Sequence, residues 1–175
     1  STDIIVIADG TTVTIDGTVS CASITVGQGT SGVLTFDGSA ARAVTVSGNV
    51  TVSAGGTFIT QSSGTYTNTL SIGGDLTNNG TFDMSRGGTT LICNTTFNKA
   101  GNQAVSGSGG TTRFNLITLN MGSSNSNILE ISSTNFAAAA GFLTLTNGTL
   151  KLSGTYALKN TLFSVAAYSI SATTG

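Results

Sequence analysis

Residues 70–84, L-S-I-G-G-D-L-T-N-N-G-T-F-D-M, predict three short strands joined by two turns. Leu70 and Ile72 alternate with polar residues, which is the pattern of a half-buried strand. A second strand begins at Leu76 after Gly-Gly, and a third one contains Phe82 after the turn-forming Asn-Asn-Gly. This stretch therefore encodes one strand–turn–strand–turn–strand unit.

The same unit occurs upstream in residues 43–60, A-V-T-V-S-G-N-V-T-V-S-A-G-G-T-F-I-T. The two copies align residue by residue, with Val44 matching Leu70, Val46 matching Ile72, Val50 matching Leu76 and Phe58 matching Phe82. A unit that recurs every 20 to 50 residues or so indicates a solenoid or a repeat array. Upstream again, we align Ile24 and Val26 with Val44 and Val46, a spacing of 20 residues.

Recurrence in the same order separates a solenoid from a sandwich or barrel, which could also be built from short strands with regular turns. In a sandwich, neighbouring strands are antiparallel and need not be copies, whereas in a β-helix each strand pairs with its copy one coil away. The six-residue period of a left-handed hexapeptide helix is absent. We therefore predict an all-β protein, a right-handed parallel β-helix (β-solenoid) with coils of about 20–26 residues. Residues 1–175 form a single β-helix segment, expected to be part of a longer chain.

The composition supports a folded β protein. Charged residues make up 7% of the chain and apolar residues 38%, with a net charge of −1, whereas disordered chains combine low hydrophobicity with high net charge. There is no proline, which fits a fold that uses nearly every backbone N–H in a ladder.

Charge and hydropathy also limit the partners. A sequence pI near 4.9 with six scattered Lys and Arg residues gives no basic stripe, so we expect no nucleic-acid partner. No apolar run approaches the ~20 residues of a membrane-spanning helix, so no membrane insertion is expected. The sequence opens on Ser1 rather than Met, which favours a processed or excised chain and a secreted or cell-surface location.

Several local signals mark the corners. Asp9-Gly10 and Asp16-Gly17 are expected to turn with glycine at positive φ. Asn147-Gly148 lies between two alternating strands; a corner between strands of one coil is favoured and a hairpin stays open. Residues 137–140, A-A-A-A, are expected to form a loop, and residues 168–175 to begin another strand.

The two cysteines, Cys21 and Cys93, are 72 positions apart, or some three coils. Coils stack at ~4.8 Å, so aligned positions would be roughly 14 Å apart. A disulfide needs Cα atoms within about 7 Å. Two free thiols in the core are therefore favoured over a bridge.

Acidic residues are the candidates for chemistry, and most of them adjoin glycine at turns. They are Asp3, Asp9, Asp16, Asp37, Asp75, Asp83 and Glu130. Asp75 and Asp83 could share a coil with Asp37 nearby, and paired carboxylates serve glycoside hydrolysis. Turn aspartates are ordinarily structural, however, so we expect no enzyme activity. With no histidine a zinc site is not expected, and only a weak calcium site at Asp9 or Asp16 stays open. No catalytic, cofactor-binding or metal residue is assigned, and no cofactor is expected.

A β-solenoid could present two kinds of binding face, one for ice and one for carbohydrate. A T-x-T face such as Thr12 and Thr14 could bind ice if it recurred on consecutive coils, but these rows drift. A carbohydrate face usually offers stacking Trp or Tyr, and here there is no Trp while Tyr66, Tyr156 and Tyr168 are scattered. Neither face is favoured.

Residues 97–120 read F-N-K-A-G-N-Q-A-V-S-G-S-G-G-T-T-R-F-N-L-I-T-L-N, and residues 143–152 read L-T-L-T-N-G-T-L-K-L. Together they resemble the repeat-rich surface proteins exported by Bacteroidetes. The resemblance implies a long secreted chain, often adhesin-like and routed through type IX secretion. These motifs encode coils and turns, and they transfer no catalytic residue; no C-terminal sorting domain is recognisable.

These observations predict a secreted or cell-surface, structural or adhesin-like β-solenoid segment that is non-catalytic and projects or packs at the cell surface. The alternatives are a polysaccharide-binding or polysaccharide-degrading β-helix and a self-assembling filament subunit. Expected partners are the remainder of a longer chain, or neighbouring subunits, through open β-helix ends, with surface glycans as a further partner.

Overall fold

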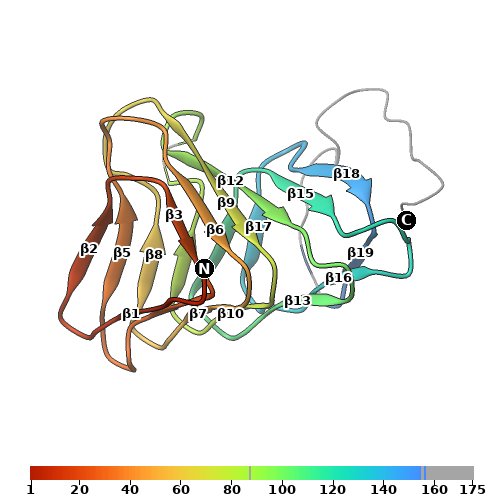
Figure 1. Ribbon diagram of the computed structural model, residues 1–175, viewed down its shortest axis with the longest axis horizontal. Helices are drawn as coiled ribbons and strands as arrows, with labels where there is room; N and C mark the ends of the chain where they lie inside the picture. Colours follow the sequence, from red (N-terminus) through yellow and green to blue (C-terminus); the bar gives the residue numbers. More distant parts are fainter. Residues whose placement is uncertain (87, 155, 157–175) are drawn as a thin grey trace.

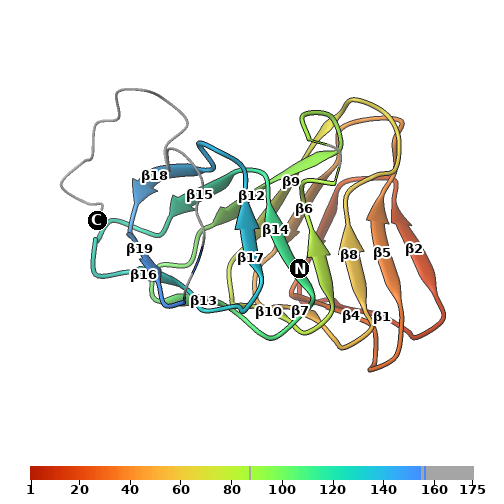
Figure 2. The ribbon, with the colours of Figure 1, turned by 180° about the vertical axis from the view of Figure 1, so that it is seen from behind.

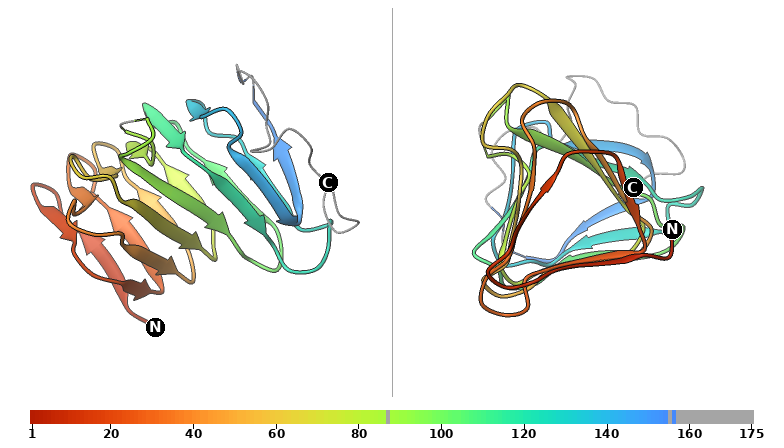
Figure 3. Two further views of the ribbon diagram at one scale, coloured as in Figure 1. Left: turned by 90° about the horizontal axis from the view of Figure 1, so that it is seen from above. Right: turned by 60° about the vertical axis from the view of Figure 1, so that its left-hand side comes forward.

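The computed structural model describes residues 1–86, 88–154 and 156. Over these residues the chain winds through three parallel sheets and forms no helix. The sheets enclose a roughly triangular interior (Figure 3). Seen from the N-terminal end, the chain turns clockwise as it recedes, so the solenoid is right-handed (Figure 3). The predicted fold class is confirmed.

Each sheet collects every third strand of the chain (Figures 1 and 2). Sheet A contains β1 (Ile4–Ile7), β4 (Ser23–Val26), β7 (Val50–Val52), β10 (Leu76–Asn78), β13 (Gln103–Ser106), β16 (Ile128–Ile131) and β19 (Thr149–Leu152). Sheet B contains β2 (Thr12–Ile15), β5 (Val33–Phe36), β8 (Thr57–Ile59), β11 (Thr81–Asp83), β14 (Thr111–Phe114) and β17 (Phe136–Ala138). Sheet C contains β3 (Val19–Cys21), β6 (Ala43–Val46), β9 (Thr67–Ile72), β12 (Ile92–Phe97), β15 (Ile117–Asn120) and β18 (Leu143–Asn147).

The stretch quoted first supplies one strand to each sheet. β9 ends at Ile72 in sheet C, β10 follows in sheet A and β11 in sheet B. The alignment with the upstream copy is the actual register, because Val44 pairs with Leu70 and Phe58 pairs with Phe82. The repeat read from the sequence is therefore one turn of the solenoid.

The alignment of Ile24 with Val44 at a spacing of 20 is wrong. Ile24 pairs with Val50 in sheet A, 26 positions later, whereas Val44 pairs with Val19 in sheet C. The sequence V-x-V or I-x-V occurs in several strands of a coil, so the local pattern does not say which sheet a strand joins. Offsets between paired residues vary more widely than expected, from 19 for Ile4–Ser23 to 30 for Thr81–Thr111, because the corner loops differ in length.

Alternation along each strand places apolar side chains inside and polar ones outside. The interior contains a file of phenylalanines that runs from coil to coil, with ring centroids 5.2–6.2 Å apart: Phe36, Phe58, Phe82, Phe114, with Phe97 beside Phe114, then Phe136 and Phe142. These distances suit favourable aromatic contacts. The core is therefore one continuous column.

The corners follow the turn signals in part. Gly10 has φ +73°, as expected, but Gly17 is not at positive φ. Asn147-Gly148 is a corner, because β18 and β19 belong to different sheets. The expectation of a loop at residues 137–140 is wrong in part, since β17 extends to Ala138 and pairs with β14. The strand expected at residues 168–175 lies outside the described residues.

Both cysteines are free and buried. Cys21 lies in β3 and Cys93 in β12, and these strands are separated by β6 and β9 within sheet C. The predicted distance of three coils is thus correct. Burial raises the pKa of both thiols, so they remain protonated.

Candidate functional site

The acidic residues considered for catalysis do not meet. Asp75 precedes β10 on sheet A, while Asp83 ends β11 on sheet B, around the corner of the same coil. Asp83 lies 3.1 Å from the guanidinium of Arg113 in the next coil. Asp37 follows β5 on sheet B and pairs with Arg42. The turn between β10 and β11 thus separates Asp75 from both of the other carboxylates.

The corner at Asp9 uses its carboxylate to hold the next coil. Its Oδ1 accepts the backbone N–H groups of Gln28 at 2.7 Å and Ser31 at 3.1 Å, and its Oδ2 accepts the Thr30 hydroxyl at 2.8 Å. The Gln28 N–H, the Thr30 hydroxyl and the other backbone donors lower the pKa of Asp9. Both carboxylate oxygens of Asp9 therefore act at this corner as hydrogen-bond acceptors. Among the described residues no three His, Cys, Asp or Glu side chains gather as a metal site would require.

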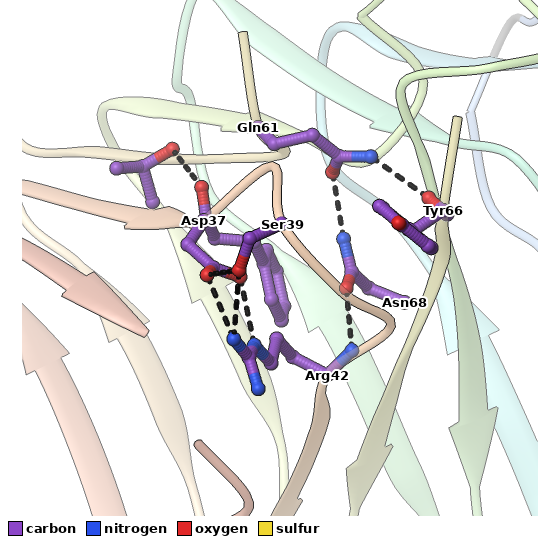
Figure 4. Close-up of polar contacts among 8 residues, drawn as sticks. Asp37, Ser39, Arg42, Gln61, Tyr66 and Asn68 are labelled. Atoms are coloured by element: carbon purple, nitrogen blue, oxygen red, sulfur yellow. Dashed lines mark hydrogen bonds and ion pairs between the residues drawn. The ribbon is translucent and has the colours of Figure 1, made fainter. Parts of the chain in front are cut away.

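A second polar cluster ties together the corners between sheets B and C (Figure 4). Asp37 and Arg42 form a bidentate pair, with Nε–Oδ1 and Nη2–Oδ2 distances of 2.7 Å, and the Ser39 hydroxyl donates to Asp37. In the next coil, the buried amides of Gln61 and Asn68 are hydrogen-bonded at 2.6 Å. Asn68 Oδ1 in turn accepts the Arg42 backbone N–H at 2.8 Å.

The Gln61 amide continues this chain of contacts. Its Nε2 donates to the Tyr66 carbonyl at 2.8 Å and to the Thr90 carbonyl of the following corner at 3.4 Å. Polar groups buried in this way are stabilising only when their partners are present. The cluster therefore connects three successive corners. Its single acid, Asp37, is paired with Arg42 and Ser39.

The Asp37–Arg42 pair predicts an acid-dependent stability. The Arg42 hydrogen bonds, followed by the Ser39 hydroxyl, hold the pKa of Asp37 well below its usual range. A carboxyl with a depressed folded-state pKa stabilises the fold above its unfolded pKa of about 3.9, and this stabilisation is lost as pH falls through the folded value. Asp37→Asn should therefore lose less unfolding free energy than the wild type between about pH 6 and about pH 2.

Urea unfolding across this pH series measures the difference. Arg42→Gln removes the same pair from the other side and should flatten the pH dependence in the same way. Wild-type acid dependence in both variants would show that the pair does not couple folding to protonation.

Among the described strands, the outward rows of threonine do not form a paired T-x-T face. The row that starts at Thr12 passes through Val33 and returns to threonine at Thr57, Thr81 and Thr111, whereas the row through Thr14 and Thr35 continues with Ile59 and Asp83. The T-x-T pair of Thr12 and Thr14 is therefore not repeated in the following coils. These rows drift as predicted. On sheet C, however, one outward column carries a hydroxyl in every coil: Ser20, Thr45, Ser71, Thr96, Thr118 and Thr144. Its neighbouring column passes through Ala43, Thr69 and Asn94, so no paired T-x-T face is built.

The outer face of sheet A carries a groove that the local sequence patterns do not predict. It has a volume of about 370 Å³, and its lining is formed by Asp75, Asn102, Gln103, Ala104, Ile128, Glu130 and Lys151. We call it the sheet A groove. It lies across β10, β13, β16 and β19, which are consecutive neighbours in the sheet.

One outward column of side chains forms the groove. Ala104 pairs with Glu130, which pairs with Lys151. Asp75 is the equivalent position one coil earlier, because the next residues, Leu76 and Val105, are paired. The small Ala104 side chain between two carboxylates leaves the hollow. A repeat alignment could have found the column, since each of its members precedes an inward aliphatic residue.

Hydrogen bonds hold the polar groups of the groove in place. Asp75 Oδ1 accepts the Ala104 backbone N–H at 3.0 Å, and Asn102 Oδ1 accepts the Ile128 backbone N–H at 3.0 Å. Glu130 Oε1 lies 3.1 Å from Lys151 Nζ. Among the described residues, neither Asp75 Oδ2 nor Asn102 Nδ2 has a recorded hydrogen-bond partner. Both atoms are thus left for a ligand.

The groove has binding groups but does not offer a proton donor at Glu130. The Ser153 hydroxyl, then the Lys151 ammonium, lower the pKa of Glu130. A general acid in glycoside cleavage needs a raised pKa instead. Glu130 is therefore an acceptor of hydrogen bonds at neutral pH.

Comparisons with known proteins add no relative. No protein-family model, no curated protein and no solved structure matches this chain. In the part of the chain that the structure describes, no helix is long and apolar enough to cross a membrane. Any functional conclusion therefore depends on the molecule's own geometry.

Proposed function

We propose that this chain is a non-catalytic β-solenoid module of a secreted or cell-surface protein, adhesin-like in kind, that serves as a rigid spacer. The observation that carries the proposal is the in-register stacking of the coils. Parallel ladders run through seven strands of sheet A and six strands each of sheets B and C. Each coil is therefore fixed to the next on all three faces, as in other solenoids whose stability comes from nearest-neighbour interfaces.

The use of charged side chains supports a structural role. Asp9 and Asp75 accept backbone N–H groups of the following coil. Asp37, Asp83 and Glu130 each form an ion pair with a basic residue. Acids that hold the next coil or the ends of one corner contribute to register and corner geometry rather than to proton transfer.

The outer surface is also suited to an extracellular spacer. The outward columns are rich in hydroxyl groups, such as Thr25, Thr51, Thr77 and Ser106 on sheet A. These groups hydrogen-bond to water without the net charge that attracts nucleic acids. The resemblance of residues 97–120 to exported Bacteroidetes surface proteins points to the same location, with type IX secretion as the route.

Surface labelling of intact cells tests the location. Antibodies raised against the purified chain should label unpermeabilised cells of the source organism, and mild protease treatment of those cells should release peptides of this chain. A cytoplasmic marker protein serves as the control for cell integrity. Labelling that appears only after permeabilisation would overturn the proposal.

A polysaccharide panel tests the absence of catalysis. The purified chain should release no more reducing ends from neutral and acidic polysaccharides than its heat-denatured control. Release that disappears in Asp75→Asn or Glu130→Gln would show that the sheet A groove is an active site and that the chain is an enzyme.

A further inference from the structure

We propose that the sheet A groove binds a short neutral saccharide, a binding activity beyond the structural role. The groove is a defined hollow of about 370 Å³ on an otherwise regular sheet. Small-molecule sites commonly occupy about 300–1,000 Å³. The proposal depends on the chemistry of the seven residues that line the hollow and not on its size alone.

The groove contains both hydrogen-bond acceptors and hydrogen-bond donors. Asp75 Oδ2 offers an acceptor and Asn102 Nδ2 a donor, each beside an oxygen that holds a backbone N–H group. Beyond Ala104, the Glu130 carboxylate accepts and the Lys151 ammonium donates. A sugar hydroxyl both donates and accepts, so the hydroxyls of one ring can satisfy a mixed set of donors and acceptors.

The same groups disfavour an anionic ligand and do not require a cationic one. An anion would approach two carboxylates, Asp75 and Glu130, while the one ammonium group, on Lys151, is already paired with Glu130. A cationic ligand would be attracted to Asp75, but it would have to compete with the Lys151 ammonium for Glu130. A neutral polyhydroxylated ligand avoids the repulsion of an anion and leaves the Glu130–Lys151 pair intact.

The spacing of the acids also argues against a shared metal ion. Asp75 and Glu130 lie two strands apart in sheet A, on either side of β13. Neighbouring strands are ~4.8 Å apart, so the two positions are separated by roughly 10 Å. A calcium ion needs its oxygens at about 2.4 Å. The interval instead leaves room for an organic ligand lying over Ala104.

The apolar floor of the groove and the hydroxyl groups beside it also suit a saccharide. Ala104 and Ile128 are partly exposed and present apolar surface to the C–H groups of a sugar ring. Two residues further along the strands, the outward hydroxyls of Thr77 and Ser106 form the next column. A saccharide longer than the groove would thus continue over a hydroxyl surface.

The experiment is a titration of the ¹⁵N-labelled full chain followed by NMR. The probes are the neutral tetrasaccharides of β-linked glucose, mannose and xylose, with tetragalacturonate and the chitosan tetramer as charged counterparts. Each is added to about 10 mM, above a weak dissociation constant of about 1 mM. At least one neutral probe should shift the Asn102 side-chain amide and the Ala104 backbone amide.

Three variants locate the site. Ala104→Arg fills the floor with an outward side chain and should abolish the shifts. Asp75→Asn keeps an oxygen for the Ala104 N–H but loses the charged acceptor, and should weaken binding about tenfold. Thr25→Arg adds the same side chain as the first variant on β4 of the same sheet, away from the groove, and should bind as the wild type does.

The outcomes decide whether the groove binds saccharide, and they do not bear on the proposal that the chain is a rigid spacer. No shift with any neutral probe, tighter binding of either charged probe, or binding that survives Ala104→Arg would each overturn the saccharide proposal. The spacer proposal is tested by surface labelling, so its failure and the failure of saccharide binding are separate results.

Discussion

Phe82→Ala should lower the free energy of unfolding by about 3–5 kcal/mol, as large-to-small substitutions of buried aromatic residues do. Phe82 is fully buried in β11. Its ring centroid lies 5.7 Å from that of Phe58 and 5.2 Å from that of Phe114. The substitution thus opens a cavity in the middle of the phenylalanine file, and the fixed backbone ladders on both sides prevent the coils from closing it.

Guanidinium chloride unfolding, followed by circular dichroism, measures this loss. Thr81→Ala is the matched control, because Thr81 is the adjacent residue of the same strand and points outward; it should change stability by less than about 1 kcal/mol. Equal losses in the two variants would contradict the view that the phenylalanine file holds the coils together.

Gly107→Ala should destabilise the protein by about 3 kcal/mol or more, from an overpacking cost and backbone strain acting together. Gly107 has φ +109°, a conformation that residues with a Cβ rarely adopt. A Cβ at this position would also overlap the backbone carbonyl oxygen of Asn78 in the preceding coil. The Asn78 side chain is buried and donates to the Thr111 carbonyl at 2.6 Å and to the Thr112 hydroxyl at 2.8 Å, so a shift there breaks further contacts.

Gly110→Ala, in the same corner, provides the control. Gly110 is not at positive φ, and a Cβ there would meet no atom within 4 Å. This variant should match or slightly exceed the wild type in melting temperature, since alanine reduces the entropy of the unfolded chain. If Gly107→Ala melted at the same temperature as Gly110→Ala, the close approach of successive coils at this corner would be disproved.

Saccharide binding and the stability variants address different faces of the molecule. Phe82 and Gly107 act on the interior and on a corner, whereas the groove lies on the outer surface of sheet A. A variant such as Ala104→Arg should therefore change ligand binding while leaving the unfolding midpoint close to that of the wild type.

Local sequence patterns predicted the strands, the interior and one full coil. Alternation in residues 70–84 identified β9, β10 and β11, and the copy in residues 43–60 gave the true register of Val44 on Leu70 and of Phe58 on Phe82. The separation of Cys21 from Cys93 by three coils followed from the same repeat. These features depend on which side of a strand a residue occupies, and that is fixed by a period of two.

The same local pattern could not assign strands to sheets where coil lengths change. Ile24 resembles Val44 as closely as it resembles Val50, yet only the second pairing occurs, because the corners before and after β5 and β6 set the register. Residues 137 and 138 illustrate the opposite case. Their alanines have weak strand preference, and pairing with β14 makes them part of β17.

The sequence alone determined that this protein is a β-solenoid with an aliphatic and aromatic interior and two unpaired thiols. Only the tertiary structure decided which outward side chains meet. It brought Asp75, Ala104, Glu130 and Lys151 into one column, and it directed Asp37 to Arg42 and Asp83 to Arg113. The physical reason is that alternation specifies inside or outside within a strand, whereas neighbours across coils depend on the lengths of all the intervening corners.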